Sequence, residues 1–126
     1  MRPKTFAVVG RGRATAAAKK GTTFRYTLSE AARVTFRIER VTRGRRVRGR
    51  CRKETPANRS KRACKRFVRA GGFAATGRAG PNRKKFSGRI RRRALRPARY
   101  RATLVATDAA GGASAPKRLA FRIVRR

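Results

Sequence analysis

Apolar and polar residues alternate with a period of two along much of the chain. Phe24, Tyr26 and Leu28 are each followed by a polar residue, and the same alternation returns over residues 34–39. Successive side chains of a β-strand point to opposite faces, so this pattern predicts strands with one buried and one solvated face. We expect the strand over residues 22–28 to pair with the strand over residues 34–39, because only a short turn separates them.

Two later segments, residues 99–107 and 117–124, show the alternation most clearly. Glycine and proline residues mark turns between the weaker segments. Residues 42–50 are expected to form a solvated hairpin or loop, and residues 51–64 have no period. Weaker strands are expected over residues 5–9, over 66–70 with Phe67 or Val68 pointing inward, over 73–76 as an edge strand, and within 82–89.

This pattern predicts an all-β fold, namely an immunoglobulin-like antiparallel β-sandwich of about seven short strands. Short strands joined by turns are typical of sandwiches, and no amphipathic helix separates them. We assign the domain to residues 21–126. Residues 1–20 are expected to be an N-terminal strand or linker, with at most a helical turn in residues 11–20.

Two membrane-related signals are not found in this sequence. The apolar stretch over residues 6–9 is too short for the hydrophobic region of a signal peptide. No run of about 20 apolar residues is present, so no transmembrane helix is expected.

The charge balance narrows the range of partners. The chain carries 39 Lys or Arg residues against 4 Asp or Glu, a formal net charge of +35 over 126 residues. One explanation is nucleic acid, whose condensed counterions are released on binding. A second is another polyanion, such as an acidic cell-wall polymer or an anionic membrane surface. A third is a GC-rich genome, because Ala, Gly, Arg and Pro make up 69 residues and Arg outnumbers Lys 30 to 9.

Clusters of basic residues in the predicted loops are the candidate polyanion-binding residues. No helix-turn-helix, RNA-recognition, KH or zinc-finger motif accompanies them, so binding to nucleic acid would be independent of sequence and sensitive to salt. The candidates are Arg43, Arg45, Arg46, Arg48, Arg50, Arg59, Lys61, Arg62, Lys65, Arg91, Arg92 and Arg93.

Cys51 and Cys64 are the only cysteines. Two cysteines without a histidine cannot complete a tetrahedral zinc site, and their spacing excludes a CxxC redox motif. A disulfide would close the basic loop between them and contribute roughly 3 kcal/mol of stability. It would also indicate an oxidising compartment outside the cytosol. The alternative is two free thiols that never meet.

The composition leaves little room for enzyme chemistry. The chain has no histidine, the commonest general base and metal ligand. None of its serines lies in a G-x-S-x-G nucleophile elbow, and its four acidic residues lie too far apart in sequence to presume a calcium site. We therefore expect no catalytic residues, no metal site and no cofactor.

Residues 95–100, Leu-Arg-Pro-Ala-Arg-Tyr, resemble the L-x-P-x-x-Y corner of fibronectin type III and related immunoglobulin-like modules. The resemblance implies a structural tyrosine corner of Leu95, Pro97 and Tyr100, in which the tyrosine hydroxyl bonds to nearby backbone. Residues 108–114 resemble the turn of bacterial immunoglobulin-like repeats, with Gly112 where these repeats usually have Asn.

Further segments extend this resemblance over roughly residues 21–126. With residues 27–36, both cysteine segments and residues 86–88, the chain is similar to Arg-rich surface modules of high-GC actinobacteria. The resemblance implies a secreted, repeated, non-catalytic sandwich domain, with neighbouring repeats in a longer chain.

Two hypotheses of different classes follow. The first is an extracellular or cell-surface structural or interaction module, whose basic loops bind anionic polymers without strict specificity. The alternative is a cytoplasmic, sequence-independent nucleic-acid-binding protein, in which both cysteines would be reduced.

Overall fold

The computed structural model describes residues 5–7 and 21–125. The predicted helical turn or linker over residues 11–20, and the end of the predicted strand over residues 5–9, lie outside the described residues. The described part contains no helix and ten strands: β1 (Thr5–Ala7), β2 (Thr22–Leu28), β3 (Ala32–Val47), β4 (Arg50–Lys53), β5 (Ala63–Gly77), β6 (Gly80–Phe86), β7 (Arg89–Ile90), β8 (Arg93–Ala94), β9 (Ala98–Thr107) and β10 (Lys117–Val124).

Six strands form the larger sheet, with β3 at its centre. The order is β1–β10–β9–β3, with β5 along the other edge of β3 and β4 paired with the far end of β3. All of these pairs are antiparallel except β1 with β10, which is parallel. Residues 33–40 of β3 lie between β9 and β5.

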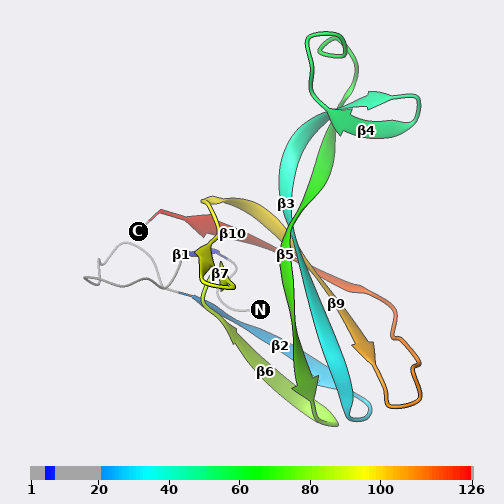
Figure 1. Ribbon diagram of the computed structural model, residues 1–126, viewed down its shortest axis with the longest axis vertical. Coiled ribbons are helices and arrows are strands. Elements are labelled where there is room, and N and C mark those ends of the chain that lie inside the picture. Colours follow the sequence, from blue (N-terminus) through cyan, green and yellow to red (C-terminus); the bar gives the residue numbers. More distant parts are fainter. Residues whose placement is uncertain (1–4, 8–20, 126) are drawn as a thin grey trace.

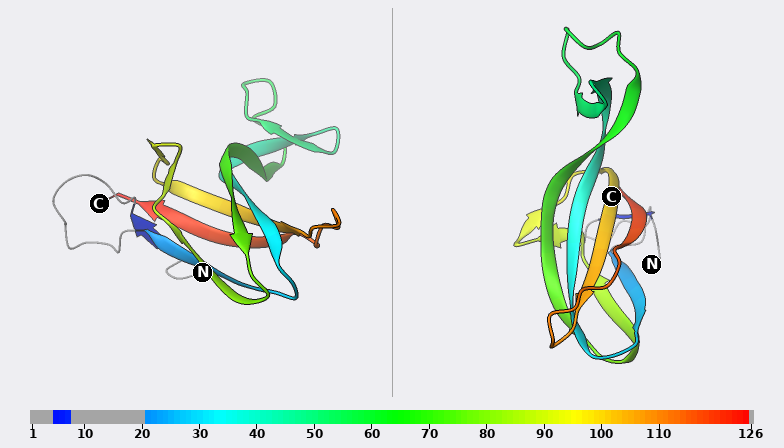
Figure 2. Two further views of the ribbon diagram at one scale, coloured as in Figure 1. Left: turned by 60° about the horizontal axis from the view of Figure 1, so that its bottom comes forward. Right: turned by 90° about the vertical axis from the view of Figure 1, so that its right-hand side faces the viewer.

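Strands β2 and β6 form a separate antiparallel pair that packs on one face of the larger sheet (Figures 1 and 2). Phe24 and Phe86 come from this pair, and the Phe24 ring lies 5.1 Å from the ring of Phe36 in β3. The alternation therefore places its apolar residues between two layers, as predicted. The buried core consists of Phe24, Val34, Phe36, Ile38, Phe86, Tyr100, Ala102, Leu104, Phe121 and Ile123.

The prediction that residues 22–28 pair with residues 34–39 is wrong. β2 pairs with β6, and β3 pairs with β5 and β9. Both β2 and β3 still bury one face, but they do so across the core from each other. A period of two defines which face of a strand is buried and does not define its neighbour in the sheet.

Two strands are much longer than the predicted short ones. β3 has 16 residues, and its end forms with β4 the hairpin expected over residues 42–50, while β5 has 15 and joins the segments expected over 66–70 and 73–76. A bulge shifts their register, since Ile38 pairs with Gly71 and Glu39 pairs with Arg69. The extra residue places Phe67 and Phe73 on opposite faces, so Phe67 is exposed. Val68, the other residue expected to point inward, is half-buried.

The far ends of β3 and β5 extend beyond the two packed sheets and carry a protruding structure, which we call the lobe (residues 43–66). It contains the end of β3, strand β4, the loop over residues 54–62 and the start of β5. Figures 1 and 2 show the lobe at one end of the molecule, away from β2, β6 and β10. None of the large buried hydrophobic side chains belongs to the lobe.

The hydrogen bond expected at the tyrosine corner is present. Tyr100 lies near the start of β9 with 2% of its surface exposed, and its hydroxyl donates to the carbonyl oxygen of Arg96 at 2.6 Å. Leu95 is half-buried and packs against the core, whereas Pro97 is exposed. Burial raises the pKa of the Tyr100 phenol, which keeps the donor proton in place.

Candidate polyanion-binding surface

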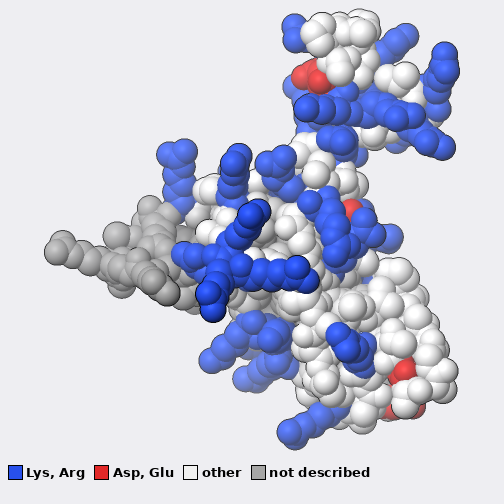
Figure 3. Space-filling view, viewed as in Figure 1, with Lys and Arg blue, Asp and Glu red and all other residues white. Residues whose placement is uncertain are grey.

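The lobe concentrates positive charge on a small part of the molecule. Residues 43–66 include 12 Lys or Arg and a single acid, Glu54. Eight of the nine candidate residues in this range have exposed side chains, and only Arg45 is half-buried. Figure 3 shows Lys and Arg side chains projecting from the lobe in several directions. Exposed cations at this density attract phosphate, sulfate and carboxylate polymers through release of their counterions.

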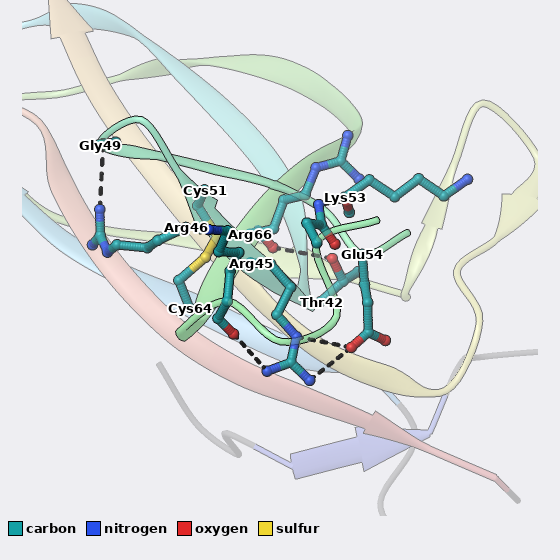
Figure 4. The surroundings of a disulfide bond; sticks show 11 residues. Thr42, Arg45, Arg46, Gly49, Cys51, Lys53, Glu54, Cys64 and Arg66 are labelled. Atoms are coloured by element: carbon teal, nitrogen blue, oxygen red, sulfur yellow. Dashed lines mark hydrogen bonds and ion pairs between the residues drawn. A yellow bond between two sulfur atoms is a disulfide. The ribbon is translucent and has the colours of Figure 1, made fainter. Parts of the chain in front are cut away.

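The predicted disulfide joins β4 to β5 at the base of the lobe (Figure 4). Its two Cα atoms lie 6.0 Å apart, and both cysteines are half-buried. Gly44 of β3 lies beneath the bridge, where an added Cβ would come within 2.7 Å of the Cys51 sulfur and of the Arg52 carbonyl oxygen. Glycine at this position therefore lets three strands approach each other around the disulfide.

Arg45, one of the candidate residues, makes two contacts within the lobe. Its Nε donates to Glu54 Oε1 at 2.8 Å (Figure 4), and its Nη1 donates to the Lys61 carbonyl oxygen at 3.0 Å. The guanidinium thus ties the beginning and the end of the loop over residues 54–62 to β3. The same hydrogen bond, with the charges of Arg45 and its neighbours, lowers the pKa of Glu54.

Asn58 orders the middle of the same loop. Its side-chain oxygen accepts from the Thr55 amide at 2.8 Å, and its side-chain nitrogen donates to the Lys53 carbonyl at 2.9 Å. Backbone bonds from Lys61 to Asn58 and from Arg46 to Arg62, both 2.8 Å, complete the loop. The loop that carries Arg59, Lys61 and Arg62 therefore has a defined shape, although it contributes no strand.

Several cations lie directly opposite one another on neighbouring strands. Like charges in such positions repel, because the Cβ atoms of directly opposed residues are only about 5 Å apart. In the lobe, a bound polyanion would place negative groups between Arg43 and Lys65 and remove the repulsion there. The opposed pairs are Arg25 with Arg83, Arg43 with Lys65, Arg45 with Arg52, and Arg99 with Arg122.

The candidates Arg91, Arg92 and Arg93 do not join the lobe. They belong to the small hairpin of β7 and β8, which Figure 1 shows apart from the lobe. All three side chains are exposed. Arg91 and Arg92 have φ angles of 50° and 71°, a backbone region that non-glycine residues rarely adopt. The predicted residues thus form one large cluster and one small, separate cluster.

Sequence reasoning missed a third basic surface, on the outer face of the larger sheet. Phe67 lies there with 37% of its surface exposed, and the guanidinium carbon of Arg101 lies 3.5 Å from its ring centroid. Arg101 also donates to Glu39 at 2.8 Å. Finding this surface required the register of β3, β5, β9 and β10, and the bulge in β5 conceals that register in the sequence.

Within the described residues, no group of three or more His, Cys, Asp or Glu side chains gathers where a metal ion could be held. No helix suited to crossing a membrane occurs in the same part of the chain. A scan against protein-family models finds no match to this chain, and searches of curated proteins and of solved structures find none either.

Proposed function

We propose that the chain is a non-catalytic structural or interaction module that binds anionic polymers through the lobe. The observation that carries this proposal is the combination of 12 basic residues with one acid in the lobe, held on a disulfide-bonded projection away from the core. Positive charge from genome composition alone would need no such projection. A projecting, cross-linked structure presents its cations to a polymer without requiring any deep cavity.

We further propose an immunoglobulin-like fold and an extracellular or cell-surface location. In immunoglobulin domains, strands B and E share one sheet, while C, F and G share the other. Here β2 and β6 form one pair, and β3, β9 and β10 lie together in the larger sheet. The Tyr100 bond at the start of β9 also corresponds to the tyrosine corner of strand F. The disulfide supports the location, because such bonds persist in oxidising compartments.

The alternative is a cytoplasmic protein that binds nucleic acid without sequence preference. The charged lobe suits phosphate backbones as well as acidic wall polymers. The state of the cysteines distinguishes the two locations, because the alternative requires free thiols in the native protein. Mass measurement of the protein isolated from its own cells, with thiols blocked before lysis, is expected to show Cys51 bonded to Cys64. Free, reactive thiols in that sample would favour the alternative.

The test of polymer binding compares two variants that lose the same charge. The first replaces four exposed lobe residues with Gln: R48Q/R50Q/R59Q/R62Q. The second removes four exposed arginines from the sandwich: R25Q/R33Q/R78Q/R83Q. We expect the lobe variant to elute from heparin and from DNA at a clearly lower salt concentration than the sandwich variant. Equal elution of the two variants would show that net charge alone determines binding, and the proposal would fail.

A further inference from the structure

An open cleft of about 540 Å³ lies where the base of the lobe meets the outer face of the larger sheet. Val41, Phe67 and Ala120 supply its apolar surface, while Lys65, Arg99 and Arg122 supply cations. These residues come from β3, β5, β9 and β10, which the register of the sheet brings side by side. A volume of this size suits a small ligand or one or two rings of a polymer.

Phe67 gives the cleft a surface on which a ring can pack. It is the one large hydrophobic side chain that is exposed in the described part of the chain. Arg101 lies against the ring and is itself held by the carboxylate of Glu39, which is only 7% exposed. Because Glu39 neutralises Arg101, this arginine fixes the position of the aromatic ring and leaves anion binding to other residues.

Arg99 and Arg122 are suited to bind the anionic group. They lie directly opposite each other in the register of β9 and β10, and both side chains are exposed. Neither Arg99 nor Arg122 takes part in an ion pair among the described residues, where the arginines that do are Arg37, Arg45 and Arg101. A sulfate or carboxylate between Arg99 and Arg122 would therefore replace repulsion with two attractive contacts.

We infer that this cleft binds an anionic glycan, with a sugar ring packed on the face of Phe67 that the Arg101 guanidinium leaves open and its sulfate or carboxylate held by Arg99 and Arg122. The C–H groups of a sugar ring carry partial positive charge, which the negative face of an aromatic ring attracts. Single-stranded nucleic acid instead binds through successive aromatic platforms, and the described residues expose only one large aromatic ring here. This inference rests on the proposed binding of polyanions and adds a preference for ring-bearing polymers.

The test measures the affinity of three probes for the full chain and its variants in about 0.15 M salt. The probes are a heparin hexasaccharide, a linear polyphosphate of matched charge, which has no rings, and oligo(dT). Phe67→Ala is expected to weaken hexasaccharide binding about fivefold to tenfold and to leave polyphosphate binding within about twofold. Phe67→Tyr retains the ring and is expected to bind the hexasaccharide like the unmodified protein.

Nuclear Overhauser contacts between the sugar protons and the Phe67 ring of the unmodified protein give a readout that needs no variant. Such contacts are expected, and their absence at saturating hexasaccharide would overturn the inference. Equal losses of hexasaccharide and polyphosphate affinity in Phe67→Ala would also contradict the inference. A loss of affinity confined to oligo(dT) would assign the cleft to nucleic acid. If neither the hexasaccharide nor polyphosphate binds the unmodified protein, the proposed function itself fails.

Discussion

Removal of the disulfide tests whether the lobe unfolds separately from the two packed sheets that hold the core. The double variant C51A/C64A leaves every large buried side chain in place, because the core residues all lie outside the lobe. What remains in the lobe is the pairing of β3 with β4 and β5, the contacts of Arg45 and the bonds of Asn58. These polar contacts are mostly exposed, and each contributes little net stability in water.

The magnitude follows from the length of the closed loop. A cross-link with a sequence separation of 13 lowers the conformational entropy of the open lobe, which raises the free energy of the open lobe by roughly 3 kcal/mol. This free energy corresponds to about a 150-fold change in the equilibrium between closed and open lobe. Since no core side chain moves when the lobe opens, we expect the change to act on the lobe and only weakly on β9 and β10.

Amide hydrogen exchange measures both regions in the same sample. In C51A/C64A, the amides of Arg46, Asn58 and Lys61, which bond within the lobe, are expected to exchange about 100-fold faster. Amides in the centre of β9 are expected to change much less. If protection falls by the same factor in β9 and in the lobe, the two parts unfold as one unit, and the reasoning is wrong.

Three further predictions follow from single contacts. The pKa of Glu54 is lowered by its bond to Arg45, so this contact stabilises the lobe above the usual carboxyl range and is lost as the pH falls through the lowered value. Acid should therefore lower the protection factors of lobe amides, measured relative to the intrinsic exchange rate at each pH, before those of β9, and Glu54→Gln should remove that dependence. R91N/R92G should stabilise the protein by about 1 kcal/mol and so raise its melting temperature, because Asn-Gly suits the positive φ angles found at these positions. A lower melting temperature would contradict this prediction. Tyr100→Phe should lower the free energy of unfolding in urea by about 1 kcal/mol. Because burial raises the pKa of Tyr100, the stability from its hydrogen bond should be lost only as the pH rises above the ordinary tyrosine range. Absorbance titration of the tyrosines would detect this ionisation.

The strands with one continuous buried face could be predicted from the sequence. β10 (Lys117–Val124) has the predicted bounds, and β9 (Ala98–Thr107) begins one residue early. Their alternation is regular because each crosses the core without a bulge. The predicted disulfide and the Tyr100 bond are also present, since two cysteines allow a single pairing and the Tyr100 hydroxyl bonds to a carbonyl only four residues away.

The length of strands β3 and β5 and the cleft beside Phe67 could not be predicted, for physical reasons. In the lobe, β3 and β5 bury no large apolar side chain, so no apolar alternation marks them as strands. The bulge beside Ile38 then reverses the facing of β5, which a strict period of two cannot represent. The contacts of Arg45 could not be predicted from the sequence either, because its side chain bonds to Glu54 and to a carbonyl oxygen 16 residues away.

The central claim is that the lobe, rather than the whole basic surface, binds polyanions. Chemical-shift mapping of backbone amides during titration with a heparin hexasaccharide tests it most directly. The largest changes are expected in β4 and in the loop over residues 54–62, with a second group around Phe67 and little change near Arg25 and Arg83. Shifts of similar size on every arginine-bearing strand, including β2 and β6, would show that the charge acts without a site.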